Sequence, residues 1–206
     1  LAIAGTAQSQ SYHNMMHDTA IWDENIVNQC DPAFGYADGY DRKLIMQGDT
    51  TINTHHYKKL YHQLYHSYLY QWQQLVFSYY FSDPPLLIGA VREDSSRKVY
   101  FLNLDTINFD PAPCQGAAFP HGDETLIYDF NLHVGDTVSW KPWNNVVTGI
   151  DSMLIADTVQ LQVFRFDAMD DYWVESLGSK LGFFGAYLPP PFECNCSLHC
   201  AEATEY

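Results

Sequence analysis

The sequence predicts an all-β protein whose antiparallel strands follow one another as an up-and-down meander. Runs rich in Val, Ile, Tyr and Phe are separated by frequent turn signals, and no strand–helix–strand rhythm indicates a parallel sheet. Polar and apolar residues alternate most clearly around Val159, Leu161 and Val163, as in a strand with one buried face. About eight to ten such strands must close into a barrel or form a two-sheet sandwich to cover their edges.

The expected strands are bounded by turns that contain Gly, Asp or Ser. A first hairpin is predicted to join 43–47 to 51–61 through a turn at Gly48 and Asp49. Further strands are predicted at 76–81, 87–92, 98–103, 125–130, 137–140, 146–154, 159–166 and 172–176. From Tyr61 to Trp72 aromatic residues recur at spacings of three and four, which favours a short helix or an aromatic-rich excursion.

Charge and hydropathy exclude several classes of protein. The 206 residues include 25 acidic side chains against 10 Lys and Arg, a formal net charge of −15. Phosphate backbones and anionic membrane surfaces would be repelled, so nucleic acid is not expected as a partner. A hydrophobic fraction of 47% argues against a disordered acidic tail, and no apolar run reaches the roughly 18 residues of a membrane span.

The first ten residues, LAIAGTAQSQ, form an apolar stretch that ends on small residues, as the end of a secretory signal peptide does. The alternative is an N-terminal strand or arm. We expect export through a signal peptide to an extracellular or cell-surface location. The remaining chain is predicted to form one β-rich domain over residues 11–200 with a tail at 201–206.

The cysteines of an exported chain are expected to form disulfides, with two bridges and one spare thiol. The candidates are Cys30, Cys114, Cys194, Cys196 and Cys200. The last three lie beside His199, but no further pair at zinc-ligand spacing follows, so neither a metal nor another cofactor is predicted. The same C-terminal segment contains three consecutive prolines at 189–191, which are unsuited to a sheet ladder.

Six segments, taken together and in order, resemble a known group of proteins. They are GDTTIN (48–53), YKKLY (57–61), GAVREDSSRKVYFL (89–102), ETLIYDFNLHVGDTV (124–138), VVTGIDSMLI (146–155) and YWVESLGSKLGFF (172–184). This pattern is similar to a β-rich domain of secreted Bacteroidota proteins, which typically precedes a C-terminal sorting domain of the type IX secretion system. The resemblance implies an extracellular or cell-surface destination and supplies no catalytic residues.

An aromatic group is the predicted ligand-binding feature, because flat rings with hydroxyls suit both sugars and protein partners. Its members are Tyr61, Tyr65, Tyr68, Tyr70 and Trp72. The alternative is that these residues line the core.

No catalytic residue is predicted. The motif G-x-S-x-G is absent, and Ser152 has no His nearby in the sequence. Asp129 and Glu175 could serve as the paired carboxylates of a glycoside hydrolase, but a chain with 25 acids always offers such pairs. Among the histidines, His62 and His66 would share one face of a helix, and an exposed surface is favoured over a metal site.

A short pattern of Asp followed by Ser or Thr resembles the O-glycosylation signal of exported Bacteroidota proteins. The acceptor candidates are Thr19, Thr50, Thr106, Thr137, Ser152 and Thr158. The alternative is that this pattern only marks turns that lead into strands.

The sequence therefore predicts a secreted or cell-surface interaction or adhesion module without catalysis of its own. Its partners would be other surface or extracellular proteins, further copies of the chain, or glycans. A structural subunit of an extracellular fibre is one alternative, in which the N-terminal arm (1–5) or an exposed strand edge pairs with a neighbour's sheet. A small carbohydrate-binding or carbohydrate-active protein is another.

Overall fold

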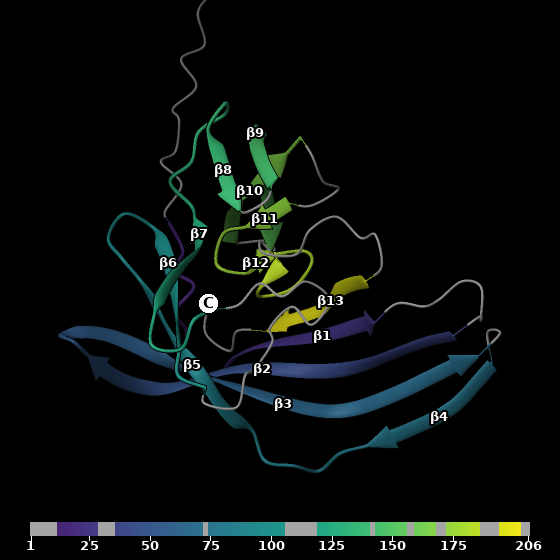
Figure 1. Ribbon diagram of the computed structural model, residues 1–206. Helices are drawn as coiled ribbons and strands as arrows, with labels where there is room; N and C mark the ends of the chain where they lie inside the picture. Colours follow the sequence, from purple (N-terminus) through teal and green to yellow (C-terminus); the bar gives the residue numbers. More distant parts are fainter. Residues whose placement is uncertain are drawn as a thin grey trace, which may run out of the picture.

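The computed structural model describes residues 12–28, 36–71, 74–105, 119–140, 143–155, 159–167, 172–185 and 194–202. These residues form two antiparallel sheets that curl into half-barrels (Figure 1). The large sheet has the strand order β13-β1-β2-β3-β5-β6-β7, with β4 as a further partner of β3, and the small sheet has the order β12-β11-β10-β9-β8. The predicted all-β, up-and-down architecture is confirmed, and β13 returns to pair with β1.

The strand bounds are as follows. The large sheet contains β1 (Ala20–Asn28), β2 (Tyr36–Ile52), β3 (His55–Gln71), β4 (Gln74–Tyr80), β5 (Leu86–Glu93), β6 (Lys98–Asn103), β7 (Glu124–Asp129) and β13 (Cys194–Glu202). The small sheet contains β8 (Thr137–Trp140), β9 (Trp143–Ile155), β10 (Val159–Phe166), β11 (Tyr172–Val174) and β12 (Gly178–Ser179). The described residues include no helix long and apolar enough to cross a membrane.

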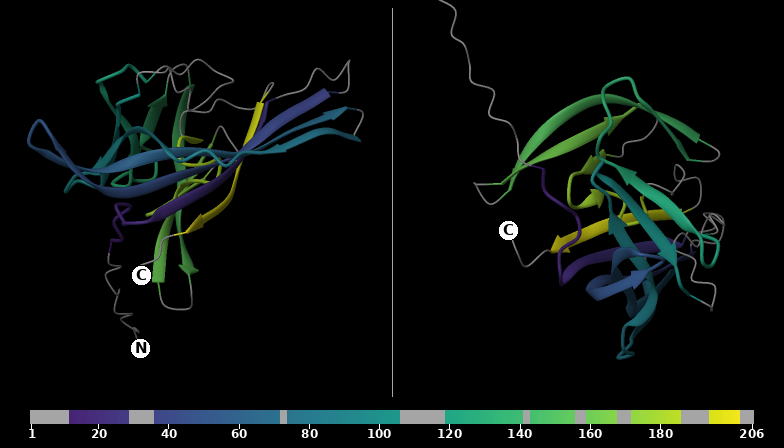
Figure 2. Two further views of the ribbon diagram at one scale, coloured as in Figure 1. Left: turned by 90° about the horizontal axis from the view of Figure 1, so that it is seen from below. Right: turned by 90° about the vertical axis from the view of Figure 1, so that its left-hand side faces the viewer.

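Aromatic side chains from both sheets form the core. Trp22 of β1 packs edge-on against Phe183 with ring centroids 4.7 Å apart, and Tyr128 of β7 meets Trp173 of β11 at 5.1 Å. Each of these four side chains is at most 1% exposed. Burying a large apolar side chain contributes about 1.5–3 kcal/mol, so these contacts hold the small sheet against the large one (Figure 2).

One ion pair lies inside this core. Nε of Arg42 on β2 is 2.7 Å from Oε2 of Glu24 on β1, and both side chains are 3% exposed. The other oxygen of Glu24 accepts the N–H of Phe183 at 2.6 Å. At Gly182, where φ is 106°, a Cβ would lie 2.7 Å from Oε1 of Glu24, so this position requires glycine.

The segment before β1 ties the two sheets together. The hydroxyl of Tyr12 and the N–H of Met15, at 2.8 Å, donate to Glu93 at the end of β5. The N–H of His13 donates to Glu175, beyond β11, at 2.6 Å. Burial raises the pKa of Glu93, although the hydrogen bonds from Tyr12 and from the N–H of Met15 offset part of that effect. The segment therefore spans from the large sheet to the small one.

Of the two alternatives expected after Tyr61, a short helix or an aromatic-rich excursion, the helix is wrong, because β3 continues as a strand to Gln71. Both edges of this strand are paired, with β2 on one side and with β5 and then β4 on the other. A helix would leave those partner strands without hydrogen bonds, so sheet pairing overrides the aromatic spacing.

The turn of the first hairpin also differs from the prediction. Its central residues are Asn53 and Thr54, both with positive φ (48° and 70°), as in the two-residue turns that match strand twist. Gly48, with φ of 74°, instead occupies an irregularity within β2, where the register with β3 shifts between Met46 and Asp49. Both hairpin strands are therefore longer than predicted.

Candidate interaction surface

Four of the five residues predicted to bind a ligand lie on β3, and Trp72 lies outside the described residues. Tyr61, Tyr65 and Tyr68 are half-buried and Tyr70 is 38% exposed. None of the four is a buried core residue. We call the side of the large sheet that is turned away from the core its outer face.

A polar network on this outer face holds two of the tyrosines. The hydroxyl of Tyr65 donates to Oδ1 of Asp23 on β1 at 2.6 Å. Nδ2 of Asn25 donates to the hydroxyl oxygen of Tyr68 at 2.7 Å and to Asp41 at 2.6 Å. Burial, followed by the hydrogen bond to Asp23, raises the pKa of Tyr65 above its usual value near 10. The network joins β1, β2 and β3 across their outer surface.

His66 extends this network to β4. Its Nδ1 lies 2.7 Å from Asp41 of β2, and its Nε2 lies 2.9 Å from the hydroxyl of Ser78. The imidazole ring also stacks on Tyr80 with centroids 4.3 Å apart and an interplanar angle of 13°. Tyr68 and Tyr70 continue the same row of rings, with centroids 5.6 Å apart. The outer face therefore carries an aromatic row flanked by Asp23, Asn25 and Asp41.

Strand β4 is exposed along its whole length, a feature that was not predicted from the sequence. Figure 1 shows it at the margin of the large sheet, away from the small sheet. Every residue from Gln74 to Tyr80 is exposed. The exposed fractions of its large apolar side chains are Leu75 54%, Val76 57%, Phe77 50%, Tyr79 53% and Tyr80 71%.

A bulge distributes these side chains over both faces. Phe77 lies opposite Leu69, whereas Leu75 lies opposite the next residue of β3, Tyr70, so Val76 has no counterpart. Leu69 and Tyr70 are successive residues of β3, so their side chains point to opposite faces of the sheet. Phe77 and Leu75, which lie opposite them, therefore also point to opposite faces. Phe77, Tyr79 and Phe81 then form a second aromatic row on the face opposite the outer one, with neighbouring centroids 6.4 and 4.8 Å apart.

Exposed apolar side chains also occur at the start of β5. Leu86 is 46% exposed and Leu87 is 37% exposed. Large contiguous apolar patches are uncommon on monomeric proteins and mark sites of interaction. A signal for this patch exists in the sequence, since QLVFSYY has neither a charge nor the polar alternation of a strand with one wet face.

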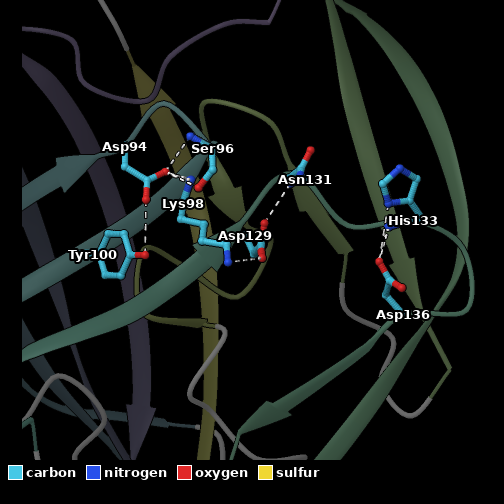
Figure 3. Close-up of polar contacts among 8 residues, drawn as sticks. All are labelled: Asp94, Ser96, Lys98, Tyr100, Asp129, Asn131, His133 and Asp136. Carbon is cyan, nitrogen blue, oxygen red and sulfur yellow. Dashed lines mark hydrogen bonds and ion pairs between the residues drawn. The ribbon is translucent and has the colours of Figure 1, made fainter.

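The acidic residues considered for catalysis have structural partners. Asp129 lies 3.5 Å from Nζ of Lys98 and accepts the N–H of Asn131 at 3.0 Å (Figure 3). Asp94, which was not a catalytic candidate, orders the β5–β6 turn by accepting hydrogen bonds from Ser96 and from the N–H of Lys98. A cleft of about 250 Å³ between β7 and β8 is lined by Asp129, by Thr137 and Ser139, and by apolar residues that include Leu126, Leu132 and Val138.

Glu175 is also held by the backbone. The residue is 1% exposed, and its two carboxylate oxygens accept the N–H groups of His13 at 2.6 Å and Gln162 at 3.0 Å. Both hydrogen bonds connect separate segments of the fold. Among the described residues this carboxylate is therefore enclosed and engaged by the backbone.

The two histidines expected on one helical face lie on opposite faces of β3. His62 pairs with Leu44, whose side chain is buried, while His66 pairs with Asp41 on the outer face. Burial, and then the nearby charge of Arg42, lowers the pKa of His62 to about 4. No group of three or more metal-ligating side chains occurs among the described residues.

The other candidate positions are distributed as follows. Cys194, Cys196 and Cys200 lie in β13, and Cys30 and Cys114 lie outside the described residues. The glycosylation candidates Thr19, Thr137 and Ser152 are exposed, Thr50 is half-buried, and Thr106 and Thr158 lie outside the described residues. Disulfide formation and glycosylation at these positions stay predictions.

Comparison of the chain with protein-family models, with curated proteins and with solved structures gives no match. The resemblance to secreted Bacteroidota proteins therefore stays a prediction.

Proposed function

We propose that this protein is a non-catalytic interaction module that binds a protein partner by adding an extended strand to β4. The observation that carries the proposal is that every residue of β4 is exposed while its large side chains are apolar. An exposed, apolar edge strand is a ready template for another strand, because its outward backbone groups are available for pairing.

Two further features support this function. The large apolar side chains of β4 are themselves at least half exposed, so a bound strand would also find apolar side-chain contacts. His66 connects β4 to Asp41 on β2, which gives the exposed strand a firm attachment to the sheet. We also propose an extracellular or cell-surface location, which the apolar N-terminal stretch and the resemblance to exported proteins favour.

A displayed library of short random peptides tests the proposal, with the purified protein as bait. We expect selected peptides rich in apolar residues that bind the wild-type protein and lose binding to Phe77→Ser. Val134→Ser is the matched control, because Val134 is 61% exposed and belongs to the β7–β8 connection rather than to β4. Failure to select any peptide, or equal binding to both variants, would contradict the proposal.

Glycan binding is a second candidate function, favoured by the aromatic row of the outer face. His66, Tyr68, Tyr70 and Tyr80 follow one another there beside the Asp23 and Asp41 carboxylates. Aromatic faces bury apolar sugar surface, while carboxylates accept hydrogen bonds from sugar hydroxyls. A glycan array probed with wild type and Tyr80→Ala would test it, and the expected result is binding that this substitution weakens.

A further inference from the structure

The hydrogen bonds between β4 and β3 define which backbone groups of β4 point toward its outward edge. The N–H of Phe81 donates to the carbonyl oxygen of Tyr65 on β3 at 2.9 Å. Backbone groups alternate in direction along an antiparallel strand, so the N–H and C=O groups of Tyr79 also point toward β3. Those of Ser78 and Tyr80 point toward the opposite edge, where the described residues provide no partner strand.

The charge distribution leaves this edge open to a second copy of the chain. Two copies carry a formal net charge of −15 each and repel one another over most approaches. The seven residues of β4 carry no charged side chain. Like charges opposite one another destabilise paired strands, and β4 avoids that cost when it meets itself.

We infer that the partner strand of β4 is β4 of a second copy, paired antiparallel about a twofold axis at Tyr79. The inference rests on the proposed function, since both use the same edge. In this register Ser78 lies opposite Tyr80 of the second copy, and these are the two residues whose backbone groups point outward. They exchange N–H···O=C bonds on both sides of the axis.

The same register matches the side chains. Tyr79 meets Tyr79 of the second copy, and Phe77 meets Phe81, so the aromatic row on this face continues across the axis. Aromatic cross-strand pairs stabilise antiparallel sheets. The bulge at Val76 lies outside the paired residues 77–81. Because both copies use the same surface, the contact is isologous and closes at a dimer.

Sedimentation velocity over a range of protein concentrations tests this geometry, with charge reversal at the axis as the perturbation. The wild-type protein is expected to form a dimer as its concentration rises. Tyr79→Lys and Tyr79→Glu each place two like charges at the axis and should raise the dimer dissociation constant about tenfold or more. A mixture of the two variants should recover dimers, because the unlike charges then lie opposite one another.

Val76→Lys is the matched control. It adds the same charge to the same strand at a side chain of similar exposure, 57% against 53% for Tyr79. Since Val76 lies outside the paired residues, its dimer should persist. Circular dichroism of each variant establishes that the sheet is retained.

Three results would overturn the inference: a wild-type protein that stays monomeric, Lys and Glu variants that do not recover dimers on mixing, or polymers that grow beyond the dimer. A monomeric protein that still selects β4-dependent peptides would refute the second copy as partner and retain the proposed function. A monomer that selects no peptide would refute both.

Discussion

The ion pair between Glu24 and Arg42 places two charges inside the core. Each side chain is 3% exposed, and the carboxylate also accepts the N–H of Phe183, so it connects β1, β2 and the segment after β12. Arg42→Met removes the positive charge and keeps much of the apolar stem. The Glu24 carboxylate is then left in the core without its cation.

The expected loss of stability follows from this burial. Removing one partner of a buried pair costs about 3–5 kcal/mol, a large share of the roughly 5–15 kcal/mol that stabilises a folded protein. In urea unfolding at pH 7 the midpoint of Arg42→Met should fall with the slope unchanged. The double variant Glu24→Gln/Arg42→Met buries neither charge and keeps an acceptor for Phe183, so it should be more stable than Arg42→Met alone.

An exposed pair provides the control. Arg165 on β10 contacts Asp151 on β9, and their side chains are 57% and 56% exposed. Solvent screens such a pair, so Arg165→Met should leave the urea midpoint unchanged. Equal losses in Arg42→Met and Arg165→Met, or a double variant that loses the sum of its two single changes, would refute the reasoning.

Three further predictions concern single positions. Gly182→Ala should destabilise the protein by about 1–3 kcal/mol in thermal unfolding, because φ is 106° and the added Cβ would meet Glu24 at 2.7 Å; an unchanged melting temperature would contradict this. Thr54→Gly should stabilise it by about 1 kcal/mol in urea unfolding, because a β-branched residue is strained at φ of 70°; a loss of stability would show that the turn does not carry this strain. Burial lowers the pKa of His62 from 6.5 to about 4, so between these pH values the unfolded chain binds a proton that the folded chain does not. The His62 contribution to stability is therefore fully present above pH 6.5. It declines as the pH falls toward 4, by about 3 kcal/mol in all. His62→Gln should remove that part of the pH dependence, while the exposed control His133→Gln should keep it; identical pH profiles for wild type and His62→Gln would contradict the prediction.

Much of the strand pattern was predictable from local sequence. The strands at 98–103, 137–140 and 159–166 have the predicted bounds, because turn residues flank them and their own residues favour extended backbone. The first strand, Ala20–Asn28, was not predicted. Glu24 occupies a core-facing position there, so a charged residue interrupts the apolar–polar alternation that would identify the strand. Only the tertiary structure shows that Arg42 pairs with this acid.

The candidate surface was predictable only in part. The tyrosines of β3 were singled out by their density, and three of them lie near one another on the outer face. The apolar residues of β4 were predicted to form a strand but were not recognised as an interaction surface. Their composition resembles that of a buried strand, and hydrophobic sequence does not reveal whether other elements cover it.

The amino-acid sequence by itself determined the all-β class, most of the turns and the absence of charge from β4, because these depend on local conformational preference and composition. The tertiary structure decided that residues 61–71 are strand, that Glu24 is compatible with the core and that β4 lies uncovered at a sheet edge. Each of these depends on partners far away in the chain. Pairing and burial are set by which strands meet, and residues separated by long stretches of sequence decide that.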